Sequence, residues 1–300
     1  MQFRLSRTAG KTVSKLALGS VLLSALLACM PNSIKEERAF IDSTLTNSPL
    51  VEHQKIEYSG GVMHSATIAR QGARDNELAA VVFVHGTPGS WQHWAYFLMH
   101  EQLQTEAMLV SIDRAGWGAS TVDDQSQAID FSYQSRAISA VLRNLQNNHN
   151  VQRIVLVGHS LGASIVPRVA MDYPELVDAV LILAGSLDPQ LGGPRWFNRL
   201  AAVPGVYWLL PHALEFSNRE IMGLQDNLVA MNSHWGELTQ PVRIVQGMQD
   251  KLVYPGNIDF LERTLSAGQL HATRLEAAGH LLHLEQRPLL LSELRALITP

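Results

Sequence analysis

The sequence contains few of the side chains that disulfides, thiolate metal sites and nucleic-acid binding require. Its single cysteine, Cys29, excludes an intramolecular disulfide and any zinc site built on several thiolates. Only 23 Lys and Arg stand against 27 Asp and Glu, so the chain lacks the basic surface of a nucleic-acid-binding protein. Apolar side chains are abundant, at 46% of 300 residues, which supports one large globular domain or two smaller ones.

The first 28 residues have the composition of a secretory signal peptide. Residues 1–15 carry four basic side chains and no acid, and an apolar run of 13 residues follows at 16–28. A membrane-spanning helix needs about 20 apolar residues, so this run fits the core of a signal peptide better. Without residues 1–28, 19 Lys and Arg remain against 27 Asp and Glu, a net charge of −8.

The segment Leu26-Leu27-Ala28-Cys29 resembles the lipobox of bacterial lipoproteins, where cleavage precedes a cysteine whose sulfur carries diacylglycerol. The resemblance implies a lipid anchor on Cys29 in the bacterial cell envelope. In enterobacterial lipoproteins an aspartate after the cysteine marks retention in the inner membrane. This sequence has Met30 at that position, so the resemblance implies that the protein is anchored in the outer membrane. Leu27 is bulkier than usual, and the alternative is an ordinary signal peptide or uncleaved anchor with an incidental cysteine. We expect residues 29–50, polar and without an apolar pattern after the cysteine, to form a flexible tether.

Apolar, β-rich runs alternate with helical patterns along the rest of the chain, for example the helical repeat at 138–145. This alternation predicts an α/β fold with a mostly parallel, doubly wound sheet. We expect an antiparallel pair, 54–58 and 64–69, to open that sheet. The predicted buried strands are Ala79–Val84, Ala107–Ile112, Arg153–Val157, Val177–Leu183 and Val242–Val245.

Residues 186–240 interrupt this alternation with prolines and aromatic side chains but no buried strand pattern. We expect them to form a helical cap inserted between two parts of the core, 51–185 and 241–300. Segments that leave the carboxyl ends of parallel strands gather over the site, so the cap is expected there. Three tryptophans are candidates for the wall of a substrate pocket, with core packing as the alternative: Trp91, Trp94 and Trp235.

The strongest chemical motif is Gly158-His159-Ser160-Leu161-Gly162, which follows one predicted strand and precedes a helical stretch. In a strand–turn–helix context, G-x-S-x-G holds its serine in a strained turn with the hydroxyl exposed. A second motif, His85-Gly86-Thr87-Pro88-Gly89, follows the strand 79–84. We expect the N–H groups of Leu161 and Thr87 to bind the oxyanion of an acyl-transfer reaction.

A nucleophilic serine needs a base and a carboxylate that orients the base. His280 lies near the C-terminus, and Asp250 follows the strand 242–245, so the order is serine, aspartate, histidine. Asp188 is the alternative acid, because it follows the strand 177–183. His283 is the alternative base, although we expect it to lie inside the last helix.

Together with Asp113-Arg114-Ala115-Gly116-Trp117-Gly118-Ala119-Ser120, these motifs resemble α/β-hydrolase fold proteins over about residues 52–298. The resemblance is to the branch with esterases, perhydrolases, epoxide hydrolases and haloalkane dehalogenases. The last two use an aspartate nucleophile, whereas Ser160 indicates attack on an acyl carbon. Asp113 and Arg114 are expected to fix a loop beneath the site.

The sequence therefore predicts a serine hydrolase that cleaves apolar carboxylic esters through an acyl-enzyme, with no cofactor and no metal. The same triad also suits a thioesterase, lactonase, perhydrolase or acyltransferase. An alternative of another class is a non-catalytic lipoprotein that binds a ligand. The expected partners are a small apolar ester and a membrane, and the sequence does not indicate an oligomeric state.

Overall fold

The computed structural model describes residues 32–45, 48–72 and 78–299. The signal peptide predicted at 1–28 and the predicted lipid attachment at Cys29 lie outside these residues. Within the described part, no helix is both long and apolar enough to cross a membrane.

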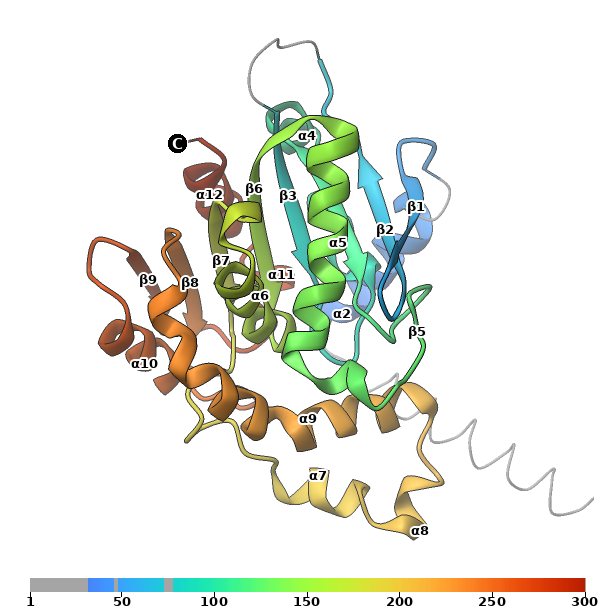
Figure 1. Cartoon of the computed structure of the whole chain (residues 1–300), viewed down its shortest axis with the longest axis vertical. Coiled ribbons are helices and arrows are strands. Elements are labelled where there is room, and N and C mark those ends of the chain that lie inside the picture. Colours follow the sequence, from blue (N-terminus) through green and yellow to red (C-terminus); the bar gives the residue numbers. More distant parts are fainter. Residues whose placement is uncertain (1–31, 46–47, 73–77, 300) are drawn as a thin grey trace, which may run out of the picture.

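One twisted sheet runs through the described part of the chain (Figure 1). The strand order is β1-β2-β4-β3-β6-β7-β8-β9, with the short β5 paired to β2. The pairs β1–β2 and β2–β4 are antiparallel, and every pair from β4 to β9 is parallel. The predicted mostly parallel sheet with an antiparallel start is confirmed. The strands are β1 Glu52–Tyr58, β2 Gly61–Ile68, β3 Leu78–Val84, β4 Met108–Asp113, β5 Thr121–Val122, β6 Val151–His159, β7 Ala179–Leu183, β8 Val242–Gly247 and β9 Leu270–Leu275.

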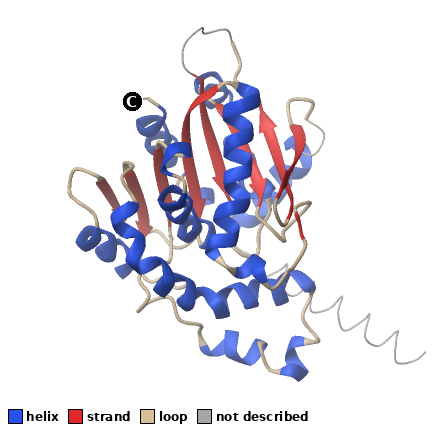
Figure 2. Ribbon diagram, in the orientation of Figure 1, coloured by secondary structure: helices blue, strands red, loops and turns tan. Residues whose placement is uncertain are grey.

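Helices cover both faces of the sheet, with α5 and α6 on one face and α12 on the other (Figures 1 and 2). In β3, Val82 and Val84 belong to the core beneath α5 and α6, whereas Val81 and Phe83 belong to the core beneath α12. Alternate strand residues point to opposite faces, so a strand buried on both faces must be apolar throughout. The helices are α2 Asn32–Phe40, α3 Ala95–Leu98, α4 Glu101–Glu106, α5 Phe131–His149, α6 Leu161–Asp172, α7 Trp196–Ala201, α8 Pro204–Tyr207, α9 His212–Met231, α10 Gly256–Thr264, α11 Leu282–Glu285 and α12 Arg287–Ile298.

The segment between β7 and β8 is helical and lies beyond the carboxyl ends of the parallel strands (Figure 1). α9 runs along that edge of the sheet, and α7 and α8 lie on the side of α9 away from the sheet. This arrangement puts a helical layer next to the loops that follow the strands, where the predicted motifs are.

The flexible tether predicted for residues 29–50 is wrong over residues 32–45. These residues form α2 and a following π-helical turn, Ile41–Leu45. Glu37 is buried and pairs with Arg287, and Leu45 belongs to the core beneath α12. The segment is polar in composition, but a few apolar and charged contacts fix it to the domain.

Candidate active site

Ser160 lies in the turn between β6 and α6, with a backbone φ of 55° and ψ of −121°. A non-glycine residue in such a region costs about 1–3 kcal/mol and is kept only where the surroundings enforce it. Here the Ser160 N–H donates to the Leu183 carbonyl of the neighbouring strand at 2.9 Å. A Cβ on Gly158 would lie 2.5 Å from Gly162, and one on Gly162 would lie 2.4 Å from the Val84 carbonyl oxygen. The turn therefore requires both glycines of the motif.

His280 and Asp250 meet in the loops after β9 and β8. The His280 Nδ1–H donates to Asp250 Oδ2 at 2.7 Å, while Oδ1 accepts from the N–H groups of Leu252 at 2.8 Å and Val253 at 2.9 Å. Burial alone raises the pKa of Asp250, but the hydrogen bond and charge of His280 and the two backbone N–H groups hold it below its usual value. A carboxylate on Nδ1 leaves Nε2 of the neutral ring free to accept a proton.

The alternative acid, Asp188, has other partners. Its Oδ1 accepts from the Gln190 N–H at 2.8 Å, and its Oδ2 lies 3.8 Å from Arg263. The Asp188 N–H donates to Asn257 Oδ1 at 2.9 Å. Asp188 thus closes its own turn, and Asp250 is the carboxylate that contacts His280.

A cavity of about 530 Å³ contains both Ser160 and His280 on its wall. Thr87 also lines it, so three of the predicted site residues are brought together. Most of the remaining wall comes from the cap and from the loops after β8 and β9. The apolar side chains of the whole wall are Ile34, Pro88, Leu191, Phe197, Ile221, Leu224, Leu252, Val253, Leu281 and Leu284.

The three tryptophans predicted as pocket wall do not line this cavity, so that prediction is wrong. Trp94 is 1% exposed and stacks on Phe83 in the core beneath α12. Trp91 packs against two histidine rings of β1 and β2, and Trp235 packs against Phe260. The apolar part of the wall is mainly aliphatic, because most of the Trp, Tyr and Phe side chains are used in core packing or lie elsewhere on the cap.

The glycine-rich loop after β3 lies directly against the nucleophile. A Cβ on Gly86 would be 2.9 Å from the Ser160 Cβ, so only glycine permits this approach. The next residue, Thr87, donates its hydroxyl to Glu220 of α9. Leu161 is the first residue of α6, and the first N–H groups of a helix have no hydrogen-bond partner within it. These positions are compatible with the predicted oxyanion donors.

Arg114 and Glu220 form a buried ion pair that links the cap to this loop. Arg114 Nη1 lies 2.6 Å from Glu220 Oε1, and the two side chains are 0% and 2% exposed. Arg114 also donates to the carbonyl oxygens of His85 at 2.9 Å and Gly86 at 3.0 Å. The prediction that Arg114 fixes a loop is consistent with these contacts. Glu220 was not predicted, because nothing local separates it from the other polar residues of the cap.

Asp113, the neighbour of Arg114, also holds backbone in place. Its Oδ1 accepts from the Trp91 N–H at 2.9 Å and its Oδ2 from the Ala119 N–H at 2.9 Å. The same Oδ2 lies 2.9 Å from His64 Nδ1. Asp113 therefore ties the loop after β4 to the loop after β3.

Three more histidines line the cavity, His93, His159 and His283, and of these only His283 was considered from the sequence, as the alternative base. The His159 Nε2–H donates to the His280 carbonyl oxygen at 2.9 Å. Burial, followed by the nearby His280, lowers the pKa of His159 to about 3, so the ring is neutral at pH 7. His283 lies in α11 rather than in the last helix, with its ring 4.1 Å from that of His159. Burial lowers the pKa values of His283 and His93 as well.

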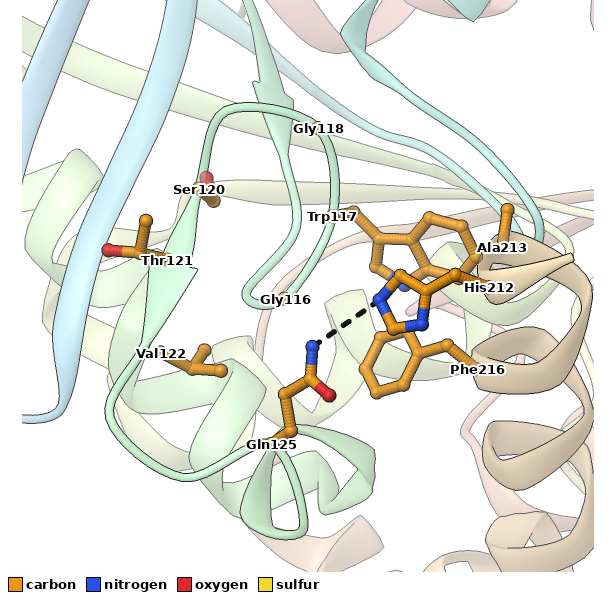
Figure 3. A pocket seen from close by; sticks show the side chains of 10 residues that line it. All are labelled: Gly116, Trp117, Gly118, Ser120, Thr121, Val122, Gln125, His212, Ala213 and Phe216. Carbon is orange, nitrogen blue, oxygen red and sulfur yellow. Dashed lines mark hydrogen bonds between the residues drawn. The ribbon is translucent and has the colours of Figure 1, made fainter.

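A second cavity, of about 440 Å³, lies between the loop after β4 and the start of α9 (Figure 3). Trp117 and Phe216 form its aromatic side, and Gln125 contacts His212 across its edge at 3.5 Å. None of Ser160, His280 or Thr87 lines it. Across the described residues, no group of three or more His, Cys, Asp or Glu side chains could hold a metal ion.

A family model described as the alpha/beta hydrolase family matches residues 81–293. Protein ABHD8 of Bos taurus is 30% identical over 205 residues, which cover 57% of this chain and 45% of ABHD8, so the match spans less than half of that relative. A candidate aryl esterase from Burkholderia cenocepacia is structurally similar, with a TM-score of 0.63, 18% identity and coverage of 82% of this chain and 97% of the other. For the epoxide hydrolase VrEH1 from Vigna radiata the TM-score is 0.61, the identity 17% and the coverage 83% and 98%. At identities this low, these two similarities show that this chain has the same fold as the two proteins.

Proposed function

This chain belongs to the alpha/beta hydrolase family, and on that premise we propose that it is a serine hydrolase that cleaves apolar carboxylic esters. The observation that carries the proposal is the hydrogen bond of 2.7 Å from His280 to Asp250, with Ser160 and His280 on the wall of one cavity. The strained backbone of Ser160 supports it, because such strain clusters at reactive residues.

In the proposed reaction, Ser160 Oγ attacks the ester carbonyl while His280 Nε2 takes the hydroxyl proton. His280 then gives this proton to the leaving alcohol, and an acyl-enzyme remains on Ser160. A water molecule, deprotonated by His280, attacks the acyl group and releases the acid. Asp250 keeps the imidazole in the tautomer that accepts at Nε2 and stabilises the ring when it is charged.

The oxyanion of each tetrahedral intermediate is bound, in this proposal, by the backbone N–H groups of Leu161 and Thr87. The N-terminus of α6 adds its partial positive charge at the same place. Removing one such donor costs about 3 kcal/mol of transition-state stabilisation in related chemistry. The contacts of Arg114 and Glu220 with the glycine-rich loop support a fixed position for Thr87 before substrate binds.

The chemistry of the cavity wall supports an apolar acyl group as substrate. The apolar side chains of the wall are nearly all aliphatic, so burying a hydrocarbon chain against them is favourable by about 25 cal/mol per Å² of apolar surface. The fold relatives include an epoxide hydrolase. Ser160 in place of a carboxylate nucleophile favours an acyl carbon over the saturated carbon of an epoxide.

We also propose that Cys29 carries a lipid anchor and that the protein works at the bacterial cell envelope, on the outer membrane. The support is the lipobox-like segment that ends in the single cysteine of the sequence. A surface-bound hydrolase would meet apolar esters where they concentrate.

Labelling with a fluorophosphonate probe tests the nucleophile in the full chain. We expect labelling of the native protein, none of Ser160→Ala, and normal labelling of Ser186→Ala, whose serine lines the same cavity. Hydrolysis of p-nitrophenyl esters of graded chain length then tests the acyl preference. A native protein that is folded but neither labelled nor active on these esters contradicts the proposal and favours the ligand-binding alternative.

A further inference from the structure

The two short helices of the cap expose an unusual amount of apolar surface. α7 and α8 contain no buried residue, and both lie on the outer side of α9 (Figure 1). We call residues 195–214, from the residue before α7 to the first turn of α9, the cap tip. Trp196, Trp208 and Leu209 are 76%, 78% and 79% exposed, and further exposed apolar side chains of the tip are Phe197, Leu200, Val203 and Leu214. A cluster of this kind marks an interaction surface.

The charge of the cap tip is opposite to that of the rest of the protein. It contains Arg195 and Arg199 and no Asp or Glu, whereas the chain after residue 28 has a net charge of −8. Exposed Trp and Leu with neighbouring Arg are the side chains of helices that lie in the interface of an anionic bilayer. A second copy of the chain fits this surface less well, because a tip-to-tip contact would bring four arginines together.

The cap tip is continuous with the mouth of the cavity that contains Ser160. Phe197 is exposed on the tip and also lines that cavity. Arg195 lines the cavity, donates to the Leu252 carbonyl oxygen at 2.9 Å and stacks on the Tyr254 ring. Leu252 and Tyr254 are themselves exposed, so the apolar surface extends from the tip around the opening.

The N-terminal end of the described chain lies at the same cavity. Ile34 of α2 contributes to its wall. Cys29 precedes Asn32, the first residue of α2, by three residues, which span about 11 Å at most when extended. A lipid on Cys29 would therefore hold this cavity close to the membrane.

We propose that the cap tip docks on the surface of an anionic phospholipid bilayer, with the mouth of the cavity turned toward the lipid. Trp196, Trp208 and Leu209 enter the interfacial region, and Arg195 and Arg199 lie at the headgroups. This surface goes beyond the proposed hydrolysis, because the docking needs no chemistry at Ser160.

The test uses the full chain carrying Cys29→Ser, mixed with vesicles of brominated phosphatidylcholine with or without phosphatidylglycerol. Bromine quenches the fluorescence of tryptophans in the bilayer, and Trp196 and Trp208 are the two largely exposed tryptophans of the described chain. We expect phosphatidylglycerol-dependent quenching that exceeds the quenching of Trp196→Gln/Trp208→Gln. The vesicle partition coefficient of that double variant should fall about 100-fold, at about tenfold for each large apolar side chain.

The matched control is Met222→Gln/Val229→Gln, which removes two exposed apolar side chains of α9 outside the cap tip. Its partition coefficient should stay within about threefold of the parent, and residues 1–28 are common to all variants. Equal quenching of the parent and the tryptophan variant overturns the proposal. A lipid-free dimer that the tryptophan variant loses, without quenching of the parent, assigns the tip to a second copy instead. Unfolding midpoints verify that every variant is folded, and none of the binding measurements depends on ester turnover.

Discussion

Replacing Glu220 by glutamine should destabilise this protein far more than an ordinary change on a helix. Glu220 is 2% exposed in its side chain and faces the fully buried guanidinium of Arg114. Its Oε1 accepts from Arg114 at 2.6 Å and from the Trp117 indole at 3.2 Å, and its Oε2 accepts from Arg114 and Thr87. A glutamine keeps the shape but replaces one accepting oxygen by a donating amide. With the amide at the Oε2 position, the Thr87 hydroxyl can turn to accept from it, but an Arg114 N–H then faces another donor. Arg114 also keeps a charge without a counter-ion.

The size of the effect follows from the burial. Breaking a buried ion pair by removing one partner costs about 3–5 kcal/mol, because the remaining charge cannot be solvated. An exposed pair contributes about 0–1 kcal/mol. We therefore expect Glu220→Gln to lower the free energy of unfolding by about 3–5 kcal/mol, measured by urea denaturation at pH 7.

The control is Glu175→Gln, the same substitution in a pair whose side chains, Arg143 and Glu175, are 50% and 57% exposed. It should change the free energy of unfolding by less than about 1 kcal/mol. A double-mutant cycle with Arg114→Met should give a coupling energy of about 2–3 kcal/mol, at the upper end for contacting residues. Equal losses in Glu220→Gln and Glu175→Gln would falsify the interpretation of this pair as a buried link between the cap and the glycine-rich loop.

Three further predictions concern the acid of the triad, the buried His159 and the lipid anchor. Asp250→Ala should lower kcat for ester hydrolysis by about four powers of ten through misorientation of the base, whereas Asp188→Ala should change it far less; the reverse order would contradict the assignment of the acid. The pKa of His159 is lowered to about 3 in the folded protein, whereas an unfolded chain has a histidine pKa of about 6.5. As pH falls between these values, only the unfolded chain binds the proton, so the free energy of unfolding drops by up to about 1.4 kcal/mol per pH unit. His159→Gln should show a correspondingly shallower acid dependence in urea melts, and identical slopes count against a neutral buried ring. Cys29→Ser should release the protein from salt-washed membranes while leaving turnover of soluble esters unchanged, as fractionation and ester assays can establish; retention of the variant after signal cleavage would refute the lipid anchor.

The geometry around His159 supplies the physical reason for its part in these predictions. The ring is buried beside the buried His283 and the partly exposed His280, so its charged form would lose hydration without a carboxylate in contact with it. Its hydrogen bond to the His280 carbonyl oxygen holds the loop that carries the proposed base. Acid conditions therefore act on the stability of the site as well as on its proposed chemistry.

Features that depend on neighbours along the chain could be predicted from the sequence. Strand β3 is apolar at every position because it is buried on both faces, and that pattern is visible without a structure. The turn around Ser160 was equally accessible, since a glycine on each side is needed by the backbone itself. The order of Ser160, Asp250 and His280 indicated the triad, and Ser160 and Asp250 each follow a predicted strand.

Tertiary structure alone decided which distant groups meet. Asp250 and Asp188 both follow core strands, and only the paths of their loops distinguish them. The Asp250 carboxylate accepts a hydrogen bond from His280, whereas the Asp188 carboxylate accepts one from the backbone of its own turn. Glu220 could not be predicted from the sequence, because its role depends on the ion pair with Arg114, 106 residues away in the chain.

The same distinction explains two of the errors in the sequence predictions. Trp94 can serve equally well as core or as pocket wall, and the packing of α3 and the preceding turn under the sheet made it core. Residues 32–45 look like a linker by composition, yet the burial of Leu45 and the pairing of Glu37 with Arg287 join them to the domain. The sequence by itself determined the local geometry of strand, turn and helix, because backbone sterics and periodic burial act between neighbours. The folded chain determined the ion pairs, the cavity wall and the exposed cap tip, because these depend on which surfaces come together in space.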